Sequence, residues 1–270
     1  MGKIENTNEL VERYQTYLRT LSQKNALVSI SERKQKGQEC IPLIEVSNKF
    51  NPNDTILFVG FNPSGADIDY YKNNNKSKND VLIYTGESPY YKAMKEFADL
   101  CGSVTYSELD VLGIVRKTQS AVVEDFLGKT ALSLYAGMLN IFLDAIKGLR
   151  PSVIIVANAF VRKLLIAGTD SINLHFPSPK PDGTLKKLQN LYISTNSPNK
   201  SSFYSRFELK KDSVYGGYTL TIDKSKADEV QCHLYFSCML SGQRAIDLGN
   251  RENLIWLVRN YLIKKHGMKL

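Results

Sequence analysis

The segment TILFVGFNPSGAD, residues 55–67, decides the fold, because a short apolar run passes directly into a turn rich in Gly, Asn and Pro. An apolar run of this length that ends in glycine is typical of a parallel strand covered on both faces. We therefore expect residues 55–60 to form a central strand of a sheet. Residues 67–88, rich in Asn, Lys, Asp and Tyr, are expected to form a long loop at the carboxyl end of that strand.

Helical and extended patterns alternate after this strand. The sequence predicts helices over residues 89–100, 130–149 and 161–167, and strands over residues 108–115 and 152–156. In the helical stretches, apolar residues recur at spacings of three and four. This alternation predicts the α/β class, with a central mostly parallel sheet, helices on both faces in three α/β/α layers, and right-handed crossovers.

The chain is expected to consist of one large domain with an appendage. Apolar residues recur at helical spacing from Leu10 to Leu27, so residues 1–50 are expected to form an N-terminal helical extension. Residues 51–270 are expected to form the α/β/α domain. Its last element is expected to be a helix from Arg251 to about Lys265, which has a broad apolar face.

The composition of the sequence changes between residues 169 and 230. Prolines and the pair Gly216-Gly217 separate short extended pieces, which are expected around Leu191, at Tyr218–Ile222 and at Val230–Phe236. We interpret the range 169–230 as an insertion on the same sheet.

Composition excludes several classes of protein. The 270 residues are 43% hydrophobic and 23% charged, which disfavours a disordered chain and a coiled-coil rod. No run approaches the roughly 18 to 20 apolar residues that cross a bilayer, and the amphipathic start resembles no signal peptide. We expect a soluble, cytoplasmic monomer that does not associate with membranes.

Basic residues outnumber acidic ones by 35 to 27, which gives a formal net charge of +8 and favours polyanionic partners. Residues 147–187 carry seven basic side chains and two acidic ones. This stretch is interpreted either as a track for nucleic-acid phosphates or as a solvated basic face without a partner.

No metal or cofactor is expected. The four cysteines form no CxxC pair, so they lack the ligand spacing of zinc and iron-sulfur sites and are interpreted as reduced core thiols. The sequence contains no GxxxxGK[ST], GxGxxG or GxSxG motif, which weakens the ATPase, dehydrogenase and serine-hydrolase interpretations.

The turn after the first strand is the strongest candidate site. Glycine lets the backbone approach a ligand closely, proline fixes one dihedral angle, and the carboxamide of Asn62 can both donate and accept hydrogen bonds, so it can orient a water molecule. The alternative is an ordinary strand-to-loop turn without a ligand.

The stretch Gly60-Phe61-Asn62-Pro63-Ser64-Gly65 resembles the first motif of the uracil-DNA glycosylase superfamily, GxNPG, with one residue added. The resemblance implies a uracil-DNA glycosylase-like fold. It also implies that Asn62 holds the water that attacks the sugar carbon, while the other residues of the turn contact the substrate. An aromatic side chain of the following loop would stack on the flipped base, and the candidates are Tyr70, Tyr71 and Tyr84.

Two further segments extend the resemblance over roughly residues 50 to 167. Leu109–Lys117 resembles the second core strand of the family, and Leu149–Asn158 resembles its stretch of arginine, proline and apolar strand. Gly113 stands where the family has an asparagine that reads the pyrimidine edge, so the resemblance implies no particular base. Arg116, Lys117 and Gln119 follow at the carboxyl end of this strand, where open α/β sheets bind ligands, and are expected to contact DNA.

The final motif of the family, His-Pro-Ser before a DNA-entering loop, is matched by residues 236–244 (FSCMLSGQR), which contain no histidine. A competing alignment uses residues 175–179 (HFPSP). Candidates to replace the missing donor are Ser237, Ser241, Arg244 and His233, although His233 also fits a core position. Met239 or Leu240 could be an apolar wedge in DNA or a core side chain, and Gly242, Gln243 and Arg244 are expected DNA contacts.

The resemblance therefore implies a DNA glycosylase that hydrolyses the N-glycosidic bond of a deaminated, uracil-like base without a metal. The first alternative is a non-catalytic protein that binds nucleic acid or nucleotides on the same fold. The second is a nucleoside hydrolase that acts on small molecules and needs no basic DNA track.

Overall fold

The computed structural model of the chain describes residues 44–46, 55–61, 77–78, 81–82, 89–102, 105–112, 129–166, 205–240 and 245–267. Seven strands form one sheet in the order β1-β5-β2-β6-β9-β8-β7, and a separate hairpin pairs β3 with β4. The strands are β1 (Ile44–Val46), β2 (Thr55–Gly60), β3 (Ser77–Lys78), β4 (Val81–Leu82), β5 (Thr105–Asp110), β6 (Val153–Val156), β7 (Phe207–Lys211), β8 (Tyr218–Ile222) and β9 (Val230–Phe236).

The centre of the sheet is parallel. β2 pairs in parallel with β5 on one side and β6 on the other, and β6 pairs in parallel with β9. β1 and β8 run antiparallel to their neighbours β5 and β9, and β7 runs antiparallel to β8. The predictions of an α/β fold and of a central strand at residues 55–60 are confirmed.

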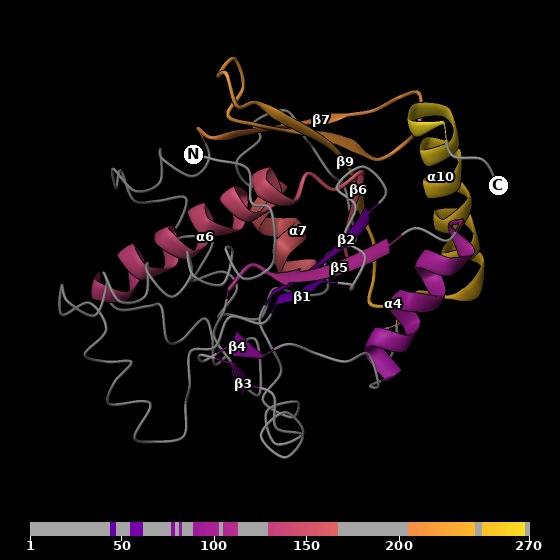
Figure 1. Cartoon of the computed structure of the whole chain (residues 1–270), viewed down its shortest axis with the longest axis horizontal. Coiled ribbons are helices and arrows are strands. Elements are labelled where there is room, and N and C mark those ends of the chain that lie inside the picture. Colours follow the sequence, from indigo (N-terminus) through magenta and orange to yellow (C-terminus); the bar gives the residue numbers. More distant parts are fainter. Residues whose placement is uncertain are drawn as a thin grey trace.

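Helices cover both faces of the sheet (Figure 1). They are α4 (Pro89–Leu100), α6 (Lys129–Leu149), α7 (Ala159–Ile166) and α10 (Leu248–His266). Side chains of β2 alternate between the two faces, because successive residues of a strand point in opposite directions. Leu57 and Val59 pack with α6 and α7, whereas Ile56 and Phe58 pack with α4 and α10. The layers are therefore helix, sheet and helix.

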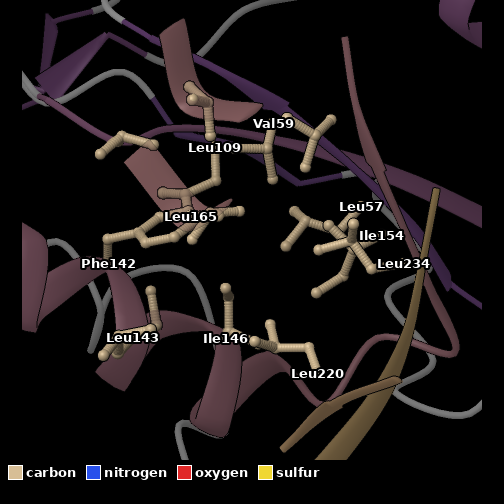
Figure 2. Close-up of a cluster of buried hydrophobic side chains, with 14 of the residues drawn as sticks. Leu57, Val59, Leu109, Phe142, Leu143, Ile146, Ile154, Leu165, Leu220 and Leu234 are labelled. Carbon is tan, nitrogen blue, oxygen red and sulfur yellow. The ribbon is translucent and has the colours of Figure 1, made fainter. Parts of the chain in front are cut away.

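Each face has its own apolar core. On the α6–α7 face, Phe142 and Ile146 of α6 lie over Ile154 of β6 and Leu220 of β8 (Figure 2). On the α4–α10 face, Phe58 makes edge-to-face contacts with Phe97 of α4 and Tyr106 of β5, with ring centroids 5.8 and 6.2 Å apart. Among the described residues, no helix is long and apolar enough to cross a membrane.

Most predicted element bounds agree with the structure to within a few residues, and β5 is the main exception. The sequence predicted a strand at 108–115, but the strand runs from Thr105 to Asp110. The sequence of β5, TYSELD, is polar and therefore gives no strand signal. The apolar residues that suggested a strand come after β5 has ended. α10 begins at Leu248 rather than Arg251, because Asp247 caps it and accepts a hydrogen bond from Asn250 N.

The sheet gains strands at both edges that the sequence did not predict. β1 lies inside the range 1–50 that was expected to be helical, and it pairs with β5. The expected helix at residues 10–27 lies outside the described residues. β7 (FELKK) has three charged residues and was missed, but it pairs with β8 over its whole length. The strand predicted at Tyr218–Ile222 is confirmed as β8 of the same sheet. The insertion at 169–230 stays a prediction, and Leu191 lies outside the described residues.

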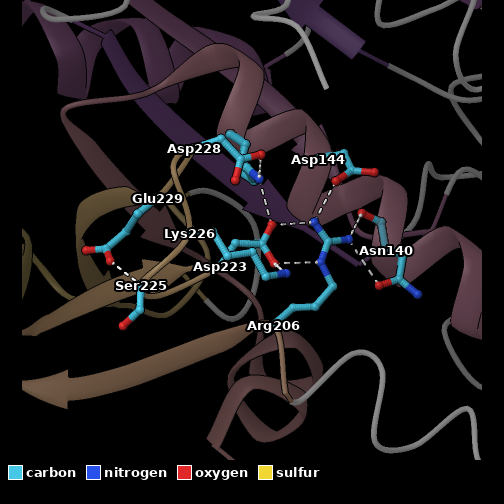
Figure 3. Close-up of polar contacts among 9 residues, drawn as sticks. Asn140, Asp144, Arg206, Asp223, Ser225, Lys226, Asp228 and Glu229 are labelled. Atoms are coloured by element: carbon cyan, nitrogen blue, oxygen red, sulfur yellow. Dashed lines mark hydrogen bonds and ion pairs between the residues drawn. The ribbon is translucent and has the colours of Figure 1, made fainter.

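An ionic cluster ties the β7–β8–β9 meander to α6 (Figure 3). Asp223 follows β8 and is 4% exposed; its Oδ2 lies 2.6 Å from Lys147 Nζ and 3.0 Å from Arg206 Nη2. The same Arg206 nitrogen lies 2.6 Å from Asp144 Oδ1, and Lys226 Nζ donates to Asp223 Oδ1. The cluster is at the end of the sheet opposite the carboxyl ends of the parallel strands, and it is structural.

Candidate functional site

The carboxyl ends of the four parallel strands meet at one edge of the sheet. Backbone hydrogen bonds continue past the strands: Val111 N donates to Gly60 O (3.1 Å), Leu112 N to Phe61 O (2.9 Å) and Ser237 N to Val156 O (2.9 Å). Three of the segments singled out in the sequence therefore begin side by side.

At this edge, the connections that leave two neighbouring strands turn to opposite faces of the sheet. The connection after β2 leads to α4 on one face, while the connection after β6 leads to α7 on the other. Ligands of open α/β sheets bind at such a point. The crevice expected on this ground lies between the ends of β2 and β6, beside Gly60 and Ala157.

A buried carboxylate beside position 60 requires glycine there. A Cβ on Gly60 would lie 2.1 Å from Asp110 Oδ1, so only glycine leaves room for that side chain. Asp110 is the register partner of Gly60 and is 6% exposed; Glu108, two residues earlier on the same face, is 4% exposed. Neither acid was predicted from the sequence as a site residue. Their alternation in ELD, at the start of the strand expected at 108–115, is the signal that could have found them.

The structure corrects the role expected for Phe61. Its side chain is 2% exposed and stacks on Phe160 of α7, with ring centroids 5.0 Å apart. Phe61 is therefore a core residue that can offer only its backbone to a substrate. Asn158, at the end of the neighbouring strand, caps α7, because its Oδ1 accepts hydrogen bonds from Phe160 N (2.8 Å) and Val161 N (3.3 Å).

The segment after β9 divides into core and surface side chains. Leu240 is 5% exposed and belongs to the core of the α4–α10 face, whereas Met239 is 39% exposed. Leu240 therefore fits the core alternative and not the DNA wedge, and Met239 remains a candidate wedge. Ser237 Oγ is buried and has no hydrogen-bond partner among the described residues.

We expect Leu240→Ala to lower the free energy of unfolding by about 2 to 5 kcal/mol, because the substitution leaves a cavity in a packed core. Met239→Ala, next to it in the chain but exposed, should change stability little. Urea denaturation of both variants checks this. Equal stabilities of the two variants would contradict the core assignment of Leu240.

A pocket of about 400 Å³ opens beside Ser237. Its wall is formed by the end of β9, the start of β8, one residue of α7 and the first turns of α10. The lining residues are Arg162, Gly217, Tyr218, Tyr235, Phe236, Ser237, Cys238, Ala245, Ile246, Asp247, Asn250, Asn253, Leu254 and Leu257. Cys238 is exposed, so it is not the core thiol that was expected; Cys101 and Cys232 are buried as predicted.

His233 is a core residue. It is 2% exposed, stacks on Tyr261 with ring centroids 4.2 Å apart, and its Nδ1 lies 3.7 Å from Asp212 Oδ2. Burial lowers the pKa of His233, and the carboxylate of Asp212 only partly opposes this. Its register partner is Val153, at the start of β6, so it does not reach the carboxyl edge.

Most predicted site residues lie outside the described residues, and their roles remain predictions. These are Asn62, Pro63, Ser64, Gly65, Tyr70, Tyr71, Tyr84, Gly113, Arg116, Lys117, Gln119, Ser241, Gly242, Gln243 and Arg244, together with the competing segment 175–179. In the basic stretch, Lys147 is engaged by Asp223 and Asp228 and is not free to bind phosphate.

Among the residues whose placement is described, no three His, Cys, Asp or Glu side chains are grouped so that they could hold a metal ion. No protein-family model matches the sequence, and no curated protein is similar enough to match it.

Proposed function

We propose that the chain is a DNA glycosylase with a uracil-DNA glycosylase-like fold, acting on a deaminated base. The observation that supports this most is the position of Gly60 and Ser237. β2 and β9 both pair with β6, so the first and last segments of the resemblance begin about 10 Å apart at one sheet edge, two strand spacings. That separation suits a base held between them.

The proposed reaction assigns one role to each segment. Asn62 orients a water molecule whose oxygen bonds to the sugar carbon. The bond between the sugar and the base breaks, and the base leaves with the electron pair and takes up the proton that the water loses. A hydrogen-bond donor aimed at the departing base lowers the barrier, because negative charge develops there. The hydroxyl of Ser237, buried without a partner among the described residues, is the donor that we propose in place of the histidine.

The direct test of the function is an assay of base release. A duplex and a single strand, each with one uracil, are incubated with the protein and treated with alkali, which cleaves the strand at abasic sites. We expect slow cleavage at the uracil position. If no abasic site forms at uracil or at any other deaminated base, the catalytic proposal is wrong.

DNA is the proposed partner, because the chain has a net charge of +8 and the residues after β5 include Arg116 and Lys117. We expect micromolar or weaker binding that falls about 10-fold or more between roughly 50 and 200 mM salt, because bound counterions are released from the phosphates. Titrations at several salt concentrations measure the slope, and the double variant Arg116→Gln, Lys117→Gln should reduce it. Salt-independent binding would favour the nucleoside-hydrolase alternative.

A non-catalytic protein that binds nucleic acid is the second candidate. It is favoured by the absence of a histidine in residues 236–244 and by Gly113 in place of an asparagine. This candidate predicts salt-dependent DNA binding without any abasic product.

A further inference from the structure

The pocket beside Ser237 shares Ser237 with the proposed catalytic site but extends over other elements. In the described part of the chain, none of its lining residues comes from β2 or β5; they come from α7, β8, β9, the segment after β9 and α10. Its volume of about 400 Å³ lies within the roughly 300 to 1,000 Å³ of typical small-molecule sites. The pocket can therefore hold a ligand of its own.

One wall of the pocket is aromatic. Tyr218 and Phe236 lie edge to face with ring centroids 5.1 Å apart, and Tyr235 lines the pocket from the opposite face of the sheet. The hydroxyl of Tyr235 already donates to the backbone oxygen of Tyr215 at 3.1 Å, which fixes that ring. A wall of this kind favours a flat ligand, because planar heterocycles gain from contact with aromatic rings.

The part of the pocket wall that α10 contributes carries two amide side chains. Asn250 and Asn253 both line the pocket, and carboxamides can donate to and accept from the mixed donor and acceptor edge of a nucleobase. One amide hydrogen of Asn250 bonds to Asp247 Oδ2 at 2.6 Å, which holds the side chain in place. Asn253 is exposed at the rim.

Among the lining residues that the structure describes, Arg162 of α7 is the one cation. The first turn of α10 does not offer an alternative anion site, because Asp247 caps it and its carboxylate accepts from Asn250 N at 3.0 Å. A negatively charged group in the pocket is therefore expected beside Arg162, because guanidinium groups suit the geometry and charge of phosphates.

We propose that this pocket binds one nucleotide unit, with its base between the Tyr218–Phe236 wall and Asn253, and its phosphate at Arg162. The unit is either a free mononucleotide or one residue of a nucleic-acid strand. Nucleotide binding here is assigned to Arg162, Asn253 and the aromatic residues and not to Asn62, although the pocket and the proposed catalytic site share Ser237.

The test is isothermal titration of the full-length chain with the four deoxynucleoside monophosphates and with a short single-stranded oligonucleotide. Arg162→Gln and Asn253→Ala are the pocket variants. Lys264→Gln, which removes one exposed charge from α10, is the matched control. We expect saturable binding of at least one mononucleotide or of the oligonucleotide, weakened about 10-fold by Arg162→Gln and almost unchanged by the control.

Weaker binding of mononucleotides alone in the pocket variants assigns a free nucleotide, and weaker binding of the oligonucleotide as well assigns a strand. The proposal is overturned if wild type binds none of these ligands, or if both pocket variants bind like the control. Asn253→Ala keeps the test valid if Arg162→Gln fails to fold, because Asn253 is exposed. Asn62→Ala should retain nucleotide binding while it loses base release, which distinguishes a failure of this proposal from a failure of the proposed function.

Discussion

Asp223→Ala should lower the free energy of unfolding by about 3 to 5 kcal/mol, the usual cost of removing one partner from a buried ion pair. Asp223 is 4% exposed and is bound by Lys147, Arg206 and Lys226. Without it, Arg206 keeps only Asp144 as an acidic partner among the ion pairs described, and the meander loses its main tie to α6. Urea denaturation of wild type and variant measures the loss.

Because Asp223 is ion-paired, the stability of the protein is also expected to fall at acid pH. Burial raises the pKa of Asp223, but hydrogen bonds from Arg206, Lys147 and Lys226 outweigh burial and hold the pKa well below its usual value. Since the pKa is lower in the folded state, the stabilisation is fully present above the unfolded pKa of about 3.9 and is lost as the pH falls further. Stability of the wild type should therefore drop below pH 4 more steeply than that of Asp223→Ala.

Asp228→Ala is the matched control, because Asp228 binds the same Lys147 but is 40% exposed. A surface ion pair contributes little, so this variant should be far less destabilised than Asp223→Ala. Equal destabilisation of the two variants, or an unchanged acid response in Asp223→Ala, would show that the buried cluster does not have this role.

The sequence predicted the elements whose apolar pattern is unambiguous. β2 and β8 and the helix α4 have the predicted bounds because their side chains alternate or recur in register with the core. β5 and β7 were misplaced or missed because buried or paired strands can carry charged residues, as in TYSELD and FELKK. Such strands form because they pair with strands that are distant in the sequence, and no local sequence pattern records that pairing.

The location of the candidate site at one sheet edge was predictable, but which of its side chains are buried was not. The expectation that residues after residue 60 and after residue 236 lie at one sheet edge follows from strand direction alone. The burial of Phe61 and Leu240 was not predictable, because an aromatic or aliphatic residue in a turn is equally compatible with a core or a binding role. The pocket is built from four separate elements, and no sequence spacing connects Arg162 with Asn253.

Asn62→Ala is the substitution with the largest expected effect on activity. A residue that orients the attacking water acts through position, and misplacement of a reacting group by about 1 Å can cost on the order of 100-fold in rate. Because electrostatic stabilisation of the transition state is lost as well, we expect the rate of base release to fall about 100- to 1000-fold. The fold should survive, because a polar turn residue after a strand contributes little to the core. Asn260→Ala on α10, well along the helix from the carboxyl edge, is the matched control and should keep the wild-type rate.

The role of Asn62 in base release is tested by abasic-site formation in uracil-containing DNA by wild type, Asn62→Ala and Asn260→Ala, at equal concentrations of folded protein. Melting temperatures are measured in parallel. We predict that wild type and Asn260→Ala release the base, and that Asn62→Ala releases almost none while its melting temperature stays close to that of the wild type. Undiminished base release by a folded Asn62→Ala protein would contradict the account.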